Sequence, residues 1–477
     1  MNRSIRRIYL AFTAAFLALI LLLGYWQVVA ADDLNDRPQN PQALQREKRI
    51  DRGTITTSDG IMLAESASKK VAGQTEFSRT YVNGALAPHV VGYSSSLEGK
   101  TGIESEYNRF LAGSFGDQPI LERLRRETKR GANLTLTIDS RIQQAAVDAL
   151  SGQRGAIVAL EPSTGAVLAM ASAPAFDLSD VETDFEAIRT GDGSPLLNRA
   201  TQGRYAPGST FKVVATTAAL ASGQFLPTTR FDDTGSFDTP GGPIRNFGGS
   251  TYGDHNLIEA LTRSINTTFA RIGTTLGPSG MGNAMDGFGF GEVPPIDLPS
   301  DQVVASGRYE GGKLLPNDEA GIDTARLAIG QERLAVTPLQ MALVASAIAN
   351  RGTMPQPFVV QSVVDRSGDV VYEARVSDLN QSASAEVADQ VGEMMTRVVL
   401  EGTGVAAALQ GLSVAGKTGT AETADEGRNQ AWFIGFAPSE DPIAAISVVI
   451  EDTSGTGGSV AAPAFADVMR AAVTAKG

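Results

Sequence analysis

The sequence of 477 residues contains no cysteine and only two histidines, His89 and His255. Without cysteine the chain has no disulfide framework, no thiol nucleophile and no thiolate metal site. Two histidines so far apart disfavour a histidine zinc site and a serine–histidine–aspartate triad. Basic residues are also in the minority, 40 against 53 acidic ones, for a net charge of −13. This balance argues against a nucleic-acid-binding surface, which needs clustered lysine and arginine.

Hydrophobic residues make up 42% of the chain and charged residues 19%, which is typical of globular proteins and not of disordered ones. The length is enough for about two to four domains.

The first long uncharged run extends from Ile8 to Ala31 and would span about 36 Å as a helix, enough to cross a bilayer. Three arginines in residues 1–7 orient the N-terminus to the cytoplasm. A cleaved signal peptide is the alternative, because residues 28–30 resemble a cleavage site, but the apolar run is longer than such peptides use. We therefore expect a single-pass anchor at residues 8–31 in the cell membrane, with everything after it extracytoplasmic.

Residues 32–152 are expected to form an N-terminal pedestal domain. Asp32 to Leu44 is polar and contains two prolines, which indicates a linker. Residues 52–130 hold short β-like runs broken by turns, and a helix is expected from Gly102 to near Gly113. The region contains no pattern that indicates chemistry, so an interaction or spacer module is expected.

Residues 153–477 are expected to form a second, larger domain. A hairpin is predicted within residues 155–172, and two further strands at 431–436 and 443–450. Thr337 is expected to cap a long apolar helix, and a final amphipathic helix covers about 463–473. Strands open and close the domain with helices between them, which predicts an α+β fold whose first and last strands lie together. A separate strand and helix, at residues 134–138 and 140–150, precede this domain, and Asp139-Ser140 is expected to cap the helix.

The first candidate motif is Ser209-Thr-Phe-Lys212, at the start of an apolar helix that runs to Gly223. Residues three apart share a helix face, so Lys212 would lie beside Ser209. A serine needs a base to act as a nucleophile, and a lysine kept neutral by burial can serve. The alternative is a helix cap and a solvated lysine, and Ser66-Ala-Ser-Lys69 has the same pattern.

The second candidate is Ser264-Ile-Asn266, within an amphipathic segment from Leu257 to Ile272. The hydroxyl could relay a proton and the amide could hold a substrate carbonyl. Two unrelated polar residues on a helix or at its end are the alternative.

The third candidate is Lys417-Thr418-Gly419-Thr420, which precedes a predicted strand and is expected to lie in a hairpin. Lys417 would offer a cation and Thr418 a hydroxyl. Gly419 would leave room for a substrate backbone to pair along the strand edge. The tripeptide recurs at residues 100–102, where it leads into a helix and is interpreted as a turn.

Each motif is weak alone, but their order along the chain is that of penicillin-binding proteins and class A β-lactamases. The chain resembles a class B penicillin-binding protein, and most closely the penicillin-binding protein A group of actinobacteria. The resemblance extends over nearly the whole chain. It includes Arg52-Gly-Thr-Ile with Asp59-Gly60, Gly102-Ile-Glu104, residues 160–170, Asn198-Arg-Ala and Trp432-Phe-Ile-Gly-Phe-Ala-Pro438. It implies a penicilloyl-serine-transferase fold: a five-stranded antiparallel sheet, a helical subdomain and the site between them.

The resemblance also implies a role for each motif residue. Ser209 would attack the penultimate D-Ala carbonyl of a peptidoglycan stem peptide, and Lys212 would take its proton. Ser264, assisted by Lys417, would relay a proton to the leaving amine, and Asn266 would hold a substrate amide. Thr418 and Thr420 would bind the terminal carboxylate beside Lys417, and the backbone N–H groups of Ser209 and Thr420 would form the oxyanion hole.

The implied activity is D,D-transpeptidation in cell-wall synthesis during division or growth, with β-lactams as covalent inhibitors. No metal or organic cofactor is implied, and the implied partners are a lipid-linked glycan polymerase and the division machinery. A D,D-carboxypeptidase or a β-lactamase would use the same motifs. The anchor, the pedestal and the lack of a Glu-x-x-Leu-Asn segment after Ser264 argue against a β-lactamase. A non-catalytic sensor or scaffold that binds peptidoglycan or β-lactams is the alternative of another class.

Overall fold

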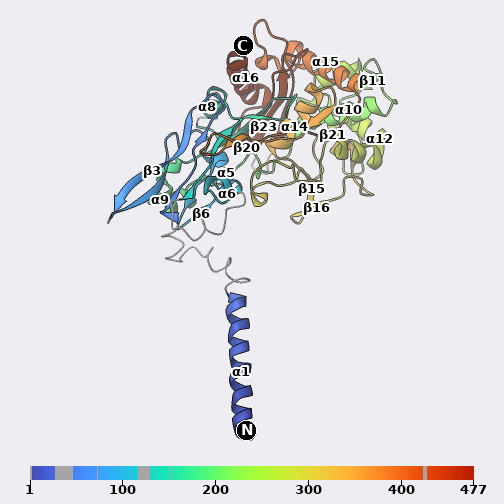
Figure 1. Cartoon of the computed structure of the whole chain (residues 1–477). Helices are drawn as coiled ribbons and strands as arrows, with labels where there is room; N and C mark the ends of the chain where they lie inside the picture. The colour runs from blue at the N-terminus through green and yellow to red at the C-terminus, as the bar shows by residue number, and fades with distance from the viewer. Residues whose placement is uncertain are drawn as a thin grey trace.

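The computed structural model describes residues 3–26, 47–71, 73–115, 129–150, 152–422 and 427–476. Helix α1 (Arg3–Gly24) stands apart from the body as a single rod, with none of its residues buried (Figure 1). Its length and hydropathy suffice to cross a membrane. The helix begins before the predicted apolar run and includes its three flanking arginines, because arginine is a good helix former. Residues 27–31 of the predicted anchor and the whole predicted linker at 32–44 lie outside the described residues.

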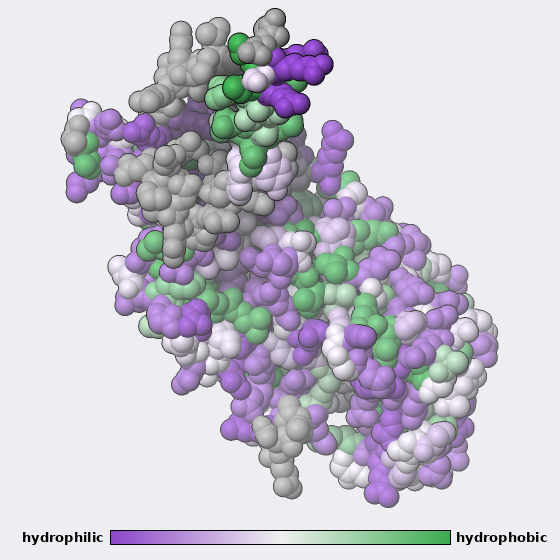
Figure 2. All heavy atoms as spheres, turned by 90° about the horizontal axis from the view of Figure 1, so that it is seen from below, coloured by the Kyte–Doolittle hydropathy of each residue, from purple (hydrophilic) through white to green (hydrophobic). Residues whose placement is uncertain are grey.

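The exposed apolar side chains of α1 contrast with the rest of the surface. Figure 2, which views the molecule from below, shows α1 as a cluster of hydrophobic residues, whereas polar and apolar residues are interspersed over the body. An exposed apolar helix of this kind is expected in lipid rather than in water.

The pedestal is built on a six-stranded sheet in the order β20-β19-β8-β2-β3-β4. Its strands are β2 (Ile55–Thr56), β3 (Met62–Val71), β4 (Gln74–Tyr81), β8 (Asn133–Leu136), β19 (Val360–Val364) and β20 (Val370–Glu373). The short strands predicted between residues 52 and 130 are confirmed. Strands β19 and β20 come from far along the chain, so the sheet joins the pedestal to the part that follows it.

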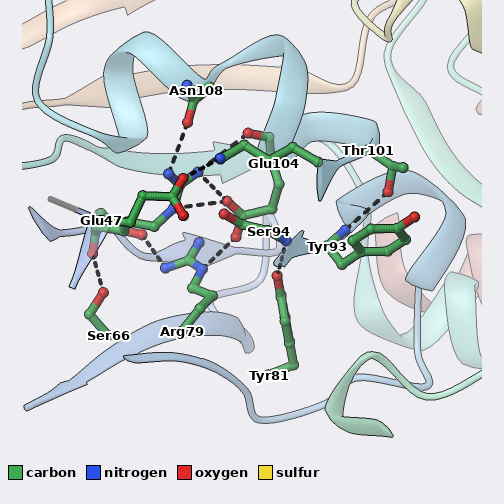
Figure 3. Close-up of polar contacts among 12 residues, drawn as sticks. Glu47, Ser66, Arg79, Tyr81, Tyr93, Ser94, Thr101, Glu104 and Asn108 are labelled. Carbon is green, nitrogen blue, oxygen red and sulfur yellow. Dashed lines mark hydrogen bonds and ion pairs between the residues drawn. The ribbon is translucent and has the colours of Figure 1, made fainter. Parts of the chain in front are cut away.

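The helix predicted after Gly102 is present as two short helices, α5 (Gly102–Glu106) and α6 (Asn108–Leu111), which meet at Tyr107. Helix α5 carries the fully buried Glu104, which forms ion pairs with Arg52 and with Arg79 of β4 (Figure 3). Burial raises the pKa of Glu104, but the two guanidinium groups outweigh burial and lower it. The carboxylate therefore stays ionised and connects α5 to the strands around it.

The second domain is centred on a five-stranded antiparallel sheet in the order β10-β9-β24-β23-β22. Its strands are β9 (Gly155–Leu160), β10 (Val167–Ala173), β22 (Ala415–Glu422), β23 (Asn429–Ala437) and β24 (Ala444–Thr453). The predicted hairpin is β9–β10. The first strand in sequence, β9, pairs with the last, β24, as predicted, with Leu160 opposite Ala445. The α+β fold class with its five-stranded antiparallel sheet is confirmed.

Helices cover both faces of this sheet. Helices α8 (Ser140–Ala149) and α16 (Ala462–Lys476) pack on one face, and α14 (Pro338–Ala349) packs on the other. Neighbouring residues of β23 point to opposite faces, so Phe433 joins the core under α16 and Trp432 joins the core under α14. The predicted caps are present: Asp139 accepts from two N–H groups of α8, and Thr337 accepts from one of α14.

The helical region lies between β10 and β22 in sequence and beside β22 in space (Figure 1). Its helices are the 3₁₀ turn η3 (Gly208–Phe211), α10 (Lys212–Ala221), α11 (Leu257–Thr262), α12 (Asn266–Gly287), α13 (Thr324–Leu327) and α15 (Ala385–Glu401). Helix α9 (Val181–Arg189) lies instead beside the pedestal, where Phe185 contacts Tyr93 (Figure 1). The small strands of the helical region include β11 (Arg230–Asp233), β12 (Ser236–Phe237), β13 (Ile244–Arg245), β14 (Gly253–Asn256), β15 (Gly307–Glu310), β16 (Lys313–Leu315) and β17 (Leu334–Ala335). Helix α10 is almost wholly buried and is the central helix of this region. Three elements meet beside β22: η3, the first turn of α10 and the turn between α11 and α12.

Candidate active site

The three motifs lie far apart in the sequence but are joined by hydrogen bonds in the structure. The Ser264 hydroxyl accepts from Lys212 Nζ at 3.2 Å and from Lys417 Nζ at 3.0 Å. Ser209 lies in η3, one helical turn before Lys212. Every residue predicted as catalytic therefore belongs to one cluster or lies next to it.

Lys212 is fully buried at the start of α10, and its amine makes two hydrogen bonds besides the one to the Ser264 hydroxyl. It donates to the Ser264 carbonyl oxygen at 2.8 Å and to Asn266 Oδ1 at 2.6 Å. Burial, and after it the charge of Lys417, lower the pKa of Lys212 well below its usual range. This shift favours loss of the proton from the Lys212 amine, and a base must be deprotonated to act.

Ser264 lies in a sharp turn between two helices and not inside one helix, as the predicted segment 257–272 suggested. Helix α11 ends at Thr262, α12 begins at Asn266, and Ser264 has a φ of 59°. A left-handed serine costs about 1–2 kcal/mol of backbone energy. The turn points both the carbonyl and the hydroxyl of Ser264 at the amine of Lys212.

Lys417 is fully buried in β22, and it donates to Ser264 Oγ and to the Thr418 carbonyl oxygen, each at 3.0 Å. Burial lowers the pKa of Lys417 to about 7. The predicted fixed cation is thus a group that titrates near neutral pH. Of the two lysines, Lys417 holds a proton more readily, because Lys212 also experiences the charge of its neighbour.

Ser209 is half-buried, and in the part of the chain that the structure describes its hydroxyl makes no hydrogen bond to another side chain. The turn η3 packs directly against β22. A Cβ atom added at Gly208 would lie 2.9 Å from the Thr420 carbonyl oxygen, and Gly208 has a φ of +52°. A Cβ at Gly419 would lie 2.7 Å from the Pro207 carbonyl oxygen. Gly419 therefore allows η3 to approach β22, and its predicted role beside a substrate backbone stays a prediction.

Thr418 and Thr420 have hydroxyl partners that the sequence pattern did not indicate. Thr418 Oγ1 lies 2.6 Å from Thr403 Oγ1, and Thr420 Oγ1 accepts from the backbone N–H of Gly457 at 3.1 Å. Thr403 follows α15, and Gly457 opens the turn before α16. Neither residue belongs to a motif, and only their place in the fold connects them to the site.

The second copies of the motifs lie in the pedestal, in other local structures. Ser66 and Lys69 are in strand β3, where residues three apart point to opposite faces, and Ser66 donates to the Arg52 carbonyl oxygen. Lys100 pairs in β6 (Gly99–Lys100) and Thr101 precedes α5, so the expected helix follows the tripeptide, but the tripeptide connects a strand to a helix and is not the expected turn. Neither copy can form a site of the kind built around Ser209.

Comparison with known proteins matches two family models to the chain. Residues 155–470 match the penicillin binding protein transpeptidase domain, and residues 52–134 match the penicillin binding protein A dimerisation domain. The first match includes all three motifs of the site.

Similar proteins and solved structures extend the match to nearly the whole chain. The peptidoglycan D,D-transpeptidase PbpA of Mycolicibacterium smegmatis is 35% identical over 97% of both chains, and that of Mycobacterium tuberculosis is 35% identical over 99% of both. The D,D-transpeptidase domain of a peptidoglycan glycosyltransferase from Eggerthella lenta is similar with a TM-score of 0.78 and 36% identity, covering 90% of this chain and 99% of that one. An imipenem acyl-enzyme complex of penicillin-binding protein A from M. tuberculosis is similar with a TM-score of 0.79 and 31% identity, covering 90% and 99%.

Proposed function

The chain belongs to the penicillin-binding protein transpeptidase family, and from this premise we propose that it is a serine D,D-transpeptidase that cross-links peptidoglycan stem peptides and is acylated by β-lactams at Ser209. The observation that carries the proposal is the hydrogen-bonded series Lys212–Ser264–Lys417 beside Ser209. It supplies a base, a relay and a proton source without histidine. The chain spans nearly the whole length of the mycobacterial PbpA proteins, which are peptidoglycan D,D-transpeptidases.

Lys212 is the base that activates Ser209. A neutral amine has two hydrogens and one lone pair. In the neutral state the Ser264 carbonyl and Asn266 Oδ1 accept the two hydrogens of Lys212, and its third and longest donation, to the Ser264 hydroxyl at 3.2 Å, is given up. The lone pair is left to take the proton of the Ser209 hydroxyl as its oxygen attacks the penultimate D-Ala carbonyl.

Ser264 relays a proton to the leaving group. Its hydroxyl lies between the two amines, so it can pass a proton to the departing D-Ala nitrogen and recover one from a lysine. The same path, run in reverse, deprotonates the amine of the acceptor peptide that attacks the acyl-enzyme.

Substrate binding is assigned to β22 and Asn266. One N–H of the Asn266 amide donates to the Arg245 carbonyl oxygen at 2.9 Å, which leaves the other for a substrate amide carbonyl. Protonated Lys417 with the hydroxyls of Thr418 and Thr420 holds the terminal carboxylate, and Gly419 keeps η3 close to them. The N–H groups of Ser209 and Thr420 form the oxyanion hole, where one donor contributes about 3 kcal/mol.

Capture of carboxylate-bearing substrates should weaken as the pH rises through about 7. Lys417, with its pKa near 7, is protonated below that pH and neutral above it. The affinity of the reversible β-lactam complex should fall by up to about tenfold per pH unit above 7. Stopped-flow acylation between about pH 6 and 9 measures this affinity. Lys417→Met should bind weakly at every pH, and a pH dependence that survives in this variant would contradict the assignment.

The penicillin adduct on Ser209 should last for hours at neutral pH. Class A β-lactamases hydrolyse theirs with a glutamate on a dedicated loop, and no Glu-x-x-Leu-Asn segment follows Ser264 in this sequence. Mass spectrometry of the intact adduct over time measures its lifetime. Loss of the adduct within seconds, with continuous release of hydrolysed drug, would assign the chain to the β-lactamases instead.

A transfer assay tests the function directly. The full chain in detergent is given a thioester or D-Ala-D-Ala donor, with and without a D-amino acid as acceptor. Acceptor-dependent transfer is the result expected of a transpeptidase. Hydrolysis that an acceptor leaves unchanged would indicate a D,D-carboxypeptidase, and a complete lack of acylation would indicate a sensor or scaffold.

The placement of the chain in the cell rests on α1. We propose a single-pass anchor with a cytoplasmic N-terminus, because three arginines lie at the start of α1 and its remainder is apolar. The pedestal (32–152) and the transpeptidase domain (153–477) would then lie outside the membrane, with the anchor and pedestal available to a lipid-linked glycan polymerase or the division machinery.

A further inference from the structure

Helix α12, which begins with Asn266, receives its cap from a distant loop. The residue before it, Ile265, makes no side-chain cap. The N–H of Thr267, in the first turn, donates instead to Asn246 Oδ1 at 3.1 Å. Asn246 follows β13, and the first turn of α12 is thereby attached to the loop between β13 and β14. Unsatisfied N–H groups at a helix start are costly when buried, so this bond is a strong local constraint.

The carboxylate of Asp233, at the end of β11, accepts hydrogen bonds from both segments, α12 and the loop between β13 and β14. It is 3% exposed and accepts four hydrogen bonds. Thr267 Oγ1 donates at 2.6 Å, Asn246 Nδ2 and the Tyr252 N–H each donate at 2.8 Å, and the Gly235 N–H donates at 2.9 Å. Burial raises the pKa of Asp233, but these bonds, that of Thr267 first, outweigh it and lower the pKa. Only an ionised carboxylate can accept from all four donors without offering a hydrogen of its own.

The Asp233 carboxylate and its partners Thr267 and Asn246, called the Asp233 clamp below, hold the residues on either side of the Asn266–Arg245 hydrogen bond in place. Asn266 donates to the carbonyl oxygen of Arg245, which precedes Asn246 in the chain, and Asn266 itself precedes Thr267. Each partner of the Asn266–Arg245 hydrogen bond is therefore one residue away from a group bound to Asp233. Because Lys212 occupies Asn266 Oδ1, the orientation of the amide is set on both sides and its remaining N–H points in one direction.

We propose that Asp233 is a positioning residue that aims the free N–H of Asn266 at the carbonyl of the amide preceding the D-Ala-D-Ala unit of the donor. The assignment rests on the proposed function. The site should therefore prefer donors and β-lactams that carry an acylamino group next to the reacting carbonyl, because they gain a hydrogen bond that other compounds lack. A bond of this kind accounts for a rate difference of roughly tenfold.

The test compares two penicillins that differ only in this group. Benzylpenicillin has the acylamino carbonyl, whereas 6-aminopenicillanic acid has the same ring and carboxylate with a free amine. The wild-type full chain should be acylated faster by benzylpenicillin. In Asp233→Asn, an amide replaces two of the acceptor positions with N–H donors, and acylation by benzylpenicillin should fall roughly tenfold further than acylation by 6-aminopenicillanic acid.

A second pair of variants keeps the test decisive if Asp233→Asn does not fold. Thr267→Val removes the hydroxyl and keeps the shape, so it should also lose the preference for benzylpenicillin. Thr267→Ser keeps the hydroxyl and should retain the preference. Asp297→Asn is the matched control, because Asp297 accepts from Val359 N, Val360 N and Tyr107 Oη at the junction with the pedestal. This control should leave the ratio of the two rates unchanged.

The outcomes separate the two proposals. An equal loss of rate with both penicillins in Asp233→Asn or Thr267→Val would mean that the clamp only stabilises the fold, and would overturn the positioning role. A wild-type chain that neither penicillin acylates would overturn the proposed function itself.

Discussion

Ser209→Ala should form no covalent adduct with a fluorescent penicillin, while the protein folds as before. The Ser209 oxygen is the proposed site of the ester bond, and the other hydroxyl of η3, that of Thr210, is fully buried and donates to the Pro207 carbonyl oxygen. The free energy of unfolding should change by less than about 1 kcal/mol, because the hydroxyl is half-exposed and binds no side chain in the described part of the chain. Gel fluorescence after incubation measures the labelling, and a thermal melt measures the fold.

Ser66→Ala is the control for this experiment. Ser66 has the same spacing to a lysine, but it lies in β3 of the pedestal and donates to the Arg52 carbonyl oxygen at 3.1 Å. This variant should be labelled like the wild type. If Ser66→Ala abolished labelling and Ser209→Ala did not, the nucleophile would be assigned to the wrong motif.

Lys212→Met should lower the acylation rate by about 10²- to 10⁴-fold, which is the usual contribution of a general base. Methionine keeps most of the buried volume, so η3 and α10 should stay in place. The reversible complex with the β-lactam should change much less, because the carboxylate is bound on β22 and not by Lys212. Rapid-mixing experiments over a range of drug concentrations separate the acylation rate from the binding constant.

Lys417→Met should weaken reversible binding of the β-lactam more than it slows acylation, the opposite of Lys212→Met. Its main effect should be on the binding constant of carboxylate-bearing β-lactams, because it removes the lysine, with a pKa of about 7, that is proposed to bind the carboxylate. Equal losses of binding and of rate in both variants would show that the two lysines do not divide these tasks.

Much of the fold is local and was therefore predictable from the sequence. The β9–β10 hairpin, the caps at Asp139 and Thr337 and the final helix depend on residues within a few positions of each other. The pairing of β9 with β24 follows from the order of elements, since strands that open and close an α+β domain tend to be neighbours. The contribution of β19 and β20 to the pedestal sheet has no local signal and was not predicted.

The sequence by itself determined the reaction class and the candidate residues, because the type and order of the three motifs restrict the chemistry of a chain without cysteine and with only two histidines. The tertiary structure decided what those residues can do. Ser209 and Lys212 lie on one face at a helix start, whereas Ser66 and Lys69 point to opposite faces of strand β3. The left-handed turn at Ser264 directs its hydroxyl and carbonyl towards Lys212. Burial sets the protonation of Lys212 and Lys417, and the hydrogen bonds of Asp233 and Thr403 join positions far apart in the chain. Such effects depend on which groups meet after folding, and no pattern of neighbouring residues contains that information.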